Sequence, residues 1–151
     1  AKGVCFIATA NIGNEYTSTR VIDRAMLDRF TIIEMEMLGA DAEKDLLKML
    51  YPNLDQESID IIGDIVGDTR TEMATESPRI STAISTRASV ELASLVYDGF
   101  TVEEAANVII YPQYDSAGGV DSERTFVKQI IQKYISDGSD EDLFNTDGIE
   151  E

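Results

Sequence analysis

The sequence predicts an α/β protein in which a short strand-containing region is followed by a domain made of helices. Three observations support this fold class. Residues 4–9 form a continuous apolar run with β-branched and aromatic side chains, which is typical of a strand buried on both faces of a parallel sheet. Residues 30–37 alternate with a period close to two and begin with β-branched residues. From Gly39 onward the apolar residues recur at helical spacing.

The first region is expected to contain two strands joined by a loop and a short helix. The loop is residues 11–19, which are polar and include Gly13, and the short helix or turn is residues 21–30. Cys5 lies inside the first predicted strand and is expected to be a buried, reduced thiol. Because two strands make an incomplete sheet, we expect the remaining strands to lie before Ala1 in a longer parent protein or in a partner chain.

The second region is expected to contain five helices, most of which carry recognisable start and stop signals. In chain order these signals are Asp41 and Pro52, Asp55 and Ser77-Pro78, Ser85 or Thr86 and Gly99, a capping box from Thr101 to Glu104, and Asp121 or Ser122 and Gly138. The residues that follow, 137–151, contain seven acidic and no basic side chains. Such a composition predicts a disordered tail.

Composition excludes several classes of function. The chain has 12 basic and 29 acidic residues, and the net charge of -17 argues against direct binding of nucleic acid or of an anionic membrane surface. The absence of histidine excludes histidine-based catalysis and histidine-ligated zinc, and the single cysteine excludes an internal disulfide. A single reduced thiol fits a reducing, cytoplasmic compartment, and because no apolar stretch approaches the length of a membrane span, the protein is expected to be soluble.

Two motifs in the first region carry a family resemblance. The segment FIATAN, residues 6–11, ends the first predicted strand, and LDRF, residues 27–30, leads into the second. Together they resemble the second half of the core of AAA+ ATPases, in particular the MoxR-like and dynein-related group that includes CbbQ and NorQ. The resemblance implies that residues 1–38 are the last strands of a parallel P-loop NTPase core, that residues 39–136 are an all-helical lid domain, and that residues 137–151 are a tail.

The resemblance also implies that two residues, Asn11 and Arg87, lie near a bound nucleotide. Asn11 falls on the family's sensor 1, which orients the attacking water, and the carboxyl ends of strands are where ligands gather in α/β sheets. Arg87, in the segment Ser85-Thr-Arg87, falls on sensor 2, an arginine of the lid that contacts nucleotide in its own or a neighbouring subunit. The alternatives are an asparagine that caps a turn and an ordinary arginine in a first helical turn.

Arg29 falls on the arginine finger of the same family, which stabilises negative charge on the transferred phosphoryl group in the neighbouring subunit. Asp28 could hold its guanidinium by a bidentate pair. Arg24 and Arg20 are candidates for a second contact of this kind. The alternative is a surface Asp-Arg pair at a helix end that contributes little.

The departures from the family pattern limit what this chain can do alone. No G-x-x-x-x-G-K-[ST] phosphate loop and no apolar strand ending in Asp-Glu occur in it. We therefore expect the isolated chain to be inactive and to bind neither ATP nor Mg²⁺ tightly, whereas its parent would be a ring-forming, hexameric ATPase. That parent would remodel an unknown protein partner or insert a metal cofactor. The rival interpretations are a non-enzymatic acidic helical interaction module and a split subunit that supplies only Arg29 in trans.

Overall fold

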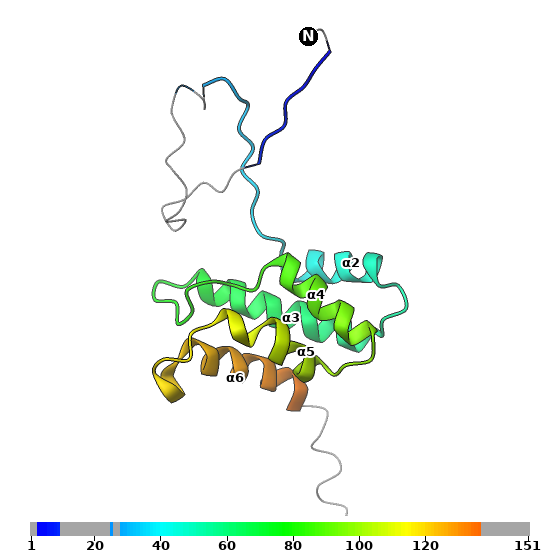
Figure 1. Ribbon diagram of the computed structural model, residues 1–151, viewed down its shortest axis with the longest axis vertical. Coiled ribbons are helices and arrows are strands. Elements are labelled where there is room, and N and C mark those ends of the chain that lie inside the picture. Colours follow the sequence, from blue (N-terminus) through cyan, green and yellow to red (C-terminus); the bar gives the residue numbers. More distant parts are fainter. Residues whose placement is uncertain (1–2, 10–24, 26–27, 137–151) are drawn as a thin grey trace, which may run out of the picture. The chain divides into compact units, whose positions relative to one another are not determined.

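The computed structural model describes residues 3–9, 25 and 28–136. The chain divides into two units, Ala1–Glu36 and Met37–Glu151. The described part of the second unit consists of α-helices and the connections between them, of which those from α3 to α4 and from α5 to α6 are long (Figure 1). Its helices are α2 (Ala40–Leu50), α3 (Gln56–Met73), α4 (Thr86–Tyr97), α5 (Val102–Ile109) and α6 (Glu123–Ser136), with 3-10 turns η1 (Tyr111–Gln113) and η2 (Gly119–Asp121).

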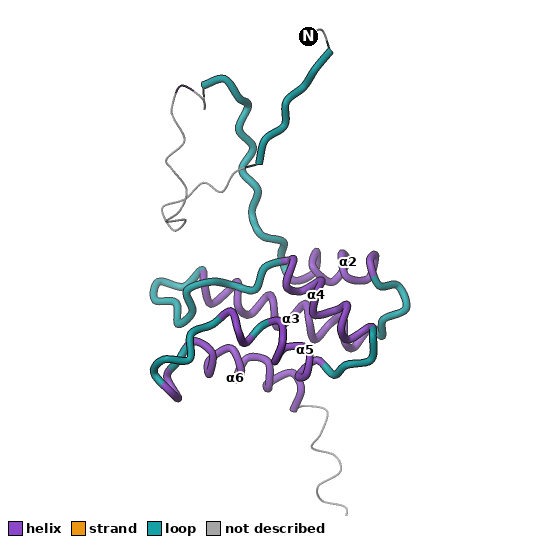
Figure 2. Tube along the Cα trace, in the orientation of Figure 1, coloured by secondary structure: helices purple, strands orange, loops and turns teal. Residues whose placement is uncertain are grey.

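The predicted α/β fold is wrong for the described residues, none of which forms a strand (Figure 2). Residues 4–9 and 31–39 have no regular secondary structure and belong to no hydrogen-bonded ladder. Their apolar side chains are exposed, including Phe6, Ile33 and Met35 at 80%, 81% and 91%, and Cys5 is exposed rather than buried. The physical reason is that a β-type sequence pattern produces a strand only where a neighbouring backbone can pair with it.

The helices predicted from Gly39 onward are confirmed, and their caps explain where they begin. Asp55 and Ser85 accept hydrogen bonds from the backbone amides of the third residues after them, and Thr101 and Glu104 form the predicted capping box. Helix α2 differs slightly, because it begins after Gly39, an N-cap without a side-chain bond, and not at Asp41. The described structure thus follows the local capping chemistry of the sequence closely.

Helix α3 is the centre of the helical unit and packs against α2, α4 and α6 (Figure 1). Helices α4 and α5 pack against each other, and α6 also contacts α5. The core between them consists of aliphatic side chains with two buried tyrosines. Its fully buried members include Leu47, Ile59, Ile62, Ile65, Val66, Ile84, Leu92, Ala93, Ala105, Ala106, Ile110, Val127 and Ile131, and Tyr111 and Tyr114 border them.

Two glycines of α3 make room for side chains of α2. A Cβ atom added at Gly67 would lie 2.9 Å from the Cβ of Ala40, and one added at Gly63 would meet the side chain of Lys44. Gly63 and Gly67 are four residues apart and so share one face of α3. The close approach of the two helices depends on the missing side chains at this face.

The described helices carry many charged residues. The longest of them, α3, has 18 residues and includes one acidic side chain, Glu57, in its first turn and one basic side chain, Arg70, in its last. Within residues 3–9, 25 and 28–136, no helix combines the length and the apolar character needed to cross a membrane. The predicted loop 11–19, most of the predicted helix 21–30 and the tail 137–151 lie outside the described residues.

Candidate functional site at the start of helix α4

The exposed side chain of Arg87 lies in the first turn of α4. Ser85 caps this helix by accepting a hydrogen bond from the amide of Ala88 at 3.2 Å. The first turn contains no acidic residue, whereas α2, α3, α5 and α6 each have at least one. Among the described residues, no hydrogen bond or ion pair to the Arg87 side chain is present. A cation at a helix N-terminus is disfavoured by about 0.3–1 kcal/mol, and an anion bound there would reverse this penalty.

A buried ion pair lies directly behind this first turn. Glu43 of α2 is fully buried, and its Oε2 accepts a hydrogen bond from Nη1 of Arg70 of α3 at 2.7 Å. The Arg70 side chain is 10% exposed. Because both charges are largely removed from water, each depends on the other and on neighbouring dipoles for its solvation.

Two hydroxyl groups of α4 complete the solvation of the Glu43 carboxylate. Thr86 Oγ1 donates to Glu43 Oε2 at 3.1 Å and accepts from Arg70 Nη2 at 3.2 Å. Ser89 Oγ lies within hydrogen-bonding distance of both Glu43 Oε1 and the carbonyl oxygen of Thr86. We call Glu43, Arg70, Thr86 and Ser89 the buried polar network. It joins α2, α3 and the first turn of α4.

Arg70 also donates hydrogen bonds to backbone carbonyl groups just before α2 and just before α4. Its Nε and Nη2 atoms donate to the carbonyl oxygen of Ile84 at 3.3 and 3.2 Å, and Nη1 donates to that of Leu38. The amide of Ile84 donates in turn to Thr69 Oγ1 at 3.2 Å. All five N–H donors of the guanidinium are therefore used, which leaves Arg70 no donor for an additional ligand.

Sequence reasoning missed the buried polar network. A signal was present, because Glu43 lies four residues before Leu47, and these two are the buried residues of α2. A carboxylate on the apolar face of a helix requires a partner, and the sequence alone does not identify which of the basic residues supplies it.

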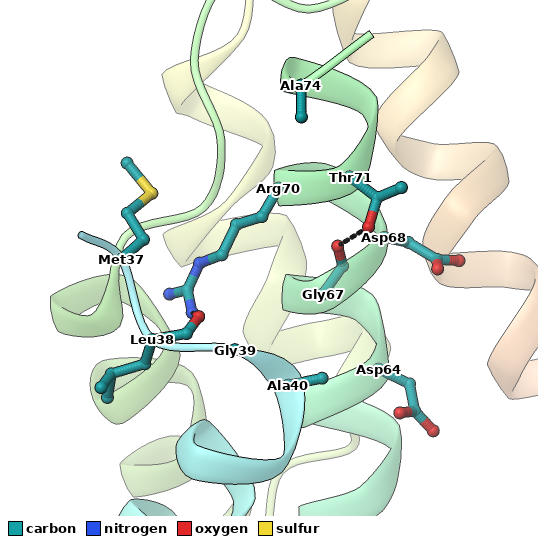
Figure 3. A pocket seen from close by; sticks show the side chains of 10 residues that line it. All are labelled: Met37, Leu38, Gly39, Ala40, Asp64, Gly67, Asp68, Arg70, Thr71 and Ala74. Carbon is teal, nitrogen blue, oxygen red and sulfur yellow. Dashed lines mark hydrogen bonds between the residues drawn. The ribbon is translucent and has the colours of Figure 1, made fainter.

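An open hollow of about 490 Å³ lies beside Arg70, where the chain enters α2 and faces α3 (Figure 3). Its two acidic residues already have partners. Asp64 binds Lys44 Nζ at 2.6 Å, and this hydrogen bond raises the pKa of Lys44. Asp68 binds Lys133 at 3.2 Å and the hydroxyl of Tyr134 at 2.8 Å. The charged groups that line the hollow are thus satisfied within the protein, so it offers a charged ligand little.

The other predicted site residues either belong to the first unit or lie outside the described residues. Asn11, Arg24 and Arg20 lie outside the described residues. Arg29 is exposed, and its Nη1 donates to the carbonyl oxygen of Ala25. No ion pair between Arg29 and Asp28 is present among the described residues, so the predicted bidentate pair is not observed. Of the predicted site residues, Arg87 is the one placed within the well-packed helical unit.

The first turn of α4 suits an anion better than a metal ion. Arg87 offers an exposed guanidinium in the first turn of a helix, where the helix dipole favours an anion such as a phosphate oxygen. A magnesium ion requires clustered oxygen ligands, and the described residues contain no group of three His, Cys, Asp or Glu side chains arranged to hold a metal. Any Mg²⁺ bound with ATP would therefore depend on ligands beyond the part of the chain that the structure describes.

Comparison with known proteins gives one local similarity. No model of a known protein family matches the chain, and no solved structure matches it. Over 48 residues the chain is 42% identical to the protein named "Putative chaperone BssE" from Thauera aromatica. The matched stretch is 32% of this chain and 17% of BssE, so the similarity covers a minor part of both proteins. The chain is thus locally similar to a chaperone-like protein.

Proposed function

We propose that this chain is the C-terminal portion of a ring-forming AAA+ ATPase of the MoxR-like group, which couples ATP hydrolysis to remodelling of a protein partner or to insertion of a metal cofactor. In this proposal the helical unit covers the nucleotide, and Arg87 contacts its phosphates. The phosphate loop and the magnesium ligands come from protein segments other than these 151 residues, because the sequence contains neither.

The observation that carries the proposal is the exposed Arg87 in the acid-free first turn of α4. Its electrostatic position favours an anion, and its sequence context resembles sensor 2. The motifs at residues 6–11 and 27–30 point to the same family, and the similarity to BssE supports a chaperone-like role. Asn11 is then the residue that orients the attacking water, and Arg29, with Arg24 as a second candidate, acts on the neighbouring subunit's nucleotide.

The test is ATP turnover by the complete ATPase carrying Arg87→Ala. Loss of the phosphate contact should lower kcat/KM for ATP at least about tenfold, since tenfold corresponds to the contribution of one good hydrogen bond to a charged group. Arg79→Ala is the matched control, because it removes the same charge from an exposed guanidinium that is already paired with Glu72. Unchanged turnover in Arg87→Ala would contradict the proposed phosphate contact, whereas a complete protein without ATP turnover would favour the non-enzymatic acidic interaction module.

The role of Arg29 can be separated from that of Asn11 by mixing subunits. Arg29→Ala should keep nucleotide affinity and lower turnover by about 10³-fold, because the finger acts on the adjacent site. Mixed with a subunit whose phosphate loop is disabled, the Arg29 variant should regain activity, since one chain offers a complete site and the other a complete finger. Asn11→Ala in the same mixture should regain none. If mixed rings form but stay inactive with Arg29→Ala, Arg24 becomes the candidate finger.

A further inference from the structure

We propose that the buried polar network positions Arg87 for its contact with the nucleotide phosphates, and that Thr86 is the residue through which this positioning acts. This inference rests on the proposed function and adds positioning residues that no sequence motif indicates. Glu43, Arg70 and Ser89 do not touch the nucleotide. They determine where the first turn of α4 lies and therefore where the Arg87 side chain begins.

The geometry fixes the backbone immediately before Arg87 from two sides. Ile84 is held at its amide by Thr69 and at its carbonyl by Arg70, so its peptide groups cannot rotate without breaking hydrogen bonds. Thr86, the residue next to Arg87, is held by its hydroxyl between Arg70 and Glu43. The Arg87 side chain, in contrast, is exposed. A fixed backbone that bears a side chain free to bind is the arrangement expected of a preorganised contact.

Stability alone does not explain why these four side chains are polar. A buried ion pair is weak evidence for stability, because apolar residues of similar volume are often as stabilising or more so. An apolar replacement would fill the space between α2, α3 and α4, but it could not fix the rotation of the first turn of α4 through directional bonds. Directional control of that turn matters if the residue after Thr86 must meet a phosphate oxygen.

The inference is tested in the complete ATPase with Thr86→Val, which removes the hydroxyl group and keeps the shape of the side chain. We expect kcat for ATP to fall on the order of tenfold with a smaller change in KM. Thr86→Ser keeps the hydroxyl group and should restore turnover. Thr75→Val is the matched control, because the Thr75 hydroxyl bonds only the Glu72 carbonyl of its own helix end. Ser89→Ala, which removes the second hydroxyl, gives the same test if Thr86→Val does not fold.

The decisive measurement combines the two sites. If Thr86 acts through Arg87, Thr86→Val should lower turnover in the wild-type background and cause no further loss in the Arg87→Ala background. Equal losses in both backgrounds would show that Thr86 matters only for folding and would overturn the inference. If Arg87→Ala lowers turnover and Thr86→Val and Ser89→Ala do not, the inference fails while the proposed function stands. If Arg87→Ala has no effect, the proposed phosphate contact of Arg87 fails, and the inference loses its premise.

Discussion

Replacing Arg70 with methionine should destabilise the helical unit more than any other single charge removal in it. Arg70→Met leaves the fully buried Glu43 carboxylate with only the two hydroxyl groups of α4, and it removes the donors that bind the Leu38 and Ile84 carbonyl groups. Breaking a buried ion pair from one side typically lowers the free energy of unfolding by about 3–5 kcal/mol. For a folded unit of this size that corresponds to a fall of ~15 °C or more in Tm.

The assay is unfolding of the 151-residue chain by urea and by heat, followed by far-ultraviolet circular dichroism. Lys133→Met is the matched control, because it breaks the exposed pair with Asp68, at 3.2 Å, and should leave the transition nearly unchanged. If Arg70→Met loses no more stability than Lys133→Met, the argument that the buried Glu43 carboxylate depends on Arg70 for its solvation is refuted.

The double variant Glu43→Leu, Arg70→Met completes the argument. Removing both charges leaves no uncompensated ion, so the free energy of unfolding should recover by at least about 2 kcal/mol relative to Arg70→Met alone. The recovered variant should nevertheless lack the control of the Arg87 backbone described above. A double variant as unstable as Arg70→Met would mean that the lost backbone hydrogen bonds, and not the stranded carboxylate, cause the destabilisation.

Three further predictions concern other parts of the helical unit. Gly67→Ala should lower Tm because its Cβ would lie 2.9 Å from that of Ala40, and adding Ala40→Gly should restore it. Asp55→Ala should lower the free energy of unfolding by about 1 kcal/mol. The Ser58 amide holds the pKa of the Asp55 carboxyl below its ordinary value, so the difference between the two proteins is fully present above the ordinary pKa and disappears as the pH falls through the lower pKa of the folded state. Urea titrations at several pH values measure this difference. Tyr114→Phe should stabilise the protein, because the buried Tyr114 hydroxyl has no hydrogen-bond partner. Burial raises the pKa of Tyr114 to about 12, so the stability of the wild type should fall as the pH rises from the ordinary tyrosine pKa toward 12. In thermal melts at alkaline pH, the Phe variant should lack the contribution of Tyr114 to this fall.

The helices could be predicted because their signals are local. Asp55, Ser85 and the Thr101-Glu104 box each bind an amide within three residues, so a short stretch of sequence contains both partners. Pro52 and Gly99 mark chain reversals for equally local reasons, and Gly99 has a φ of +100°, a conformation that glycine adopts easily.

The strands and the buried polar network depend on partners distant in sequence. Residues 4–9 have the composition of a buried strand, but composition does not supply the neighbouring backbone that a strand requires. Arg70 and Glu43 are 27 residues apart, and Ser89 and Glu43 are 46 apart. Arg87 could be singled out from its sequence context, whereas the residues that fix its backbone became visible only once three helices were placed together.

The position of Glu43 on α2 has a consequence for the dynamics of the helical unit. An outer helix that packs mainly on one neighbour usually detaches in local openings, so its amides exchange with solvent faster than those of the central helix. Detachment of α2 would leave the Arg70 guanidinium without its counterion and expose Leu47 at the same time. We therefore expect α2 to open only together with the rest of the bundle. The amides of α2 around Glu43 should exchange hydrogen as slowly as those in the middle of α3.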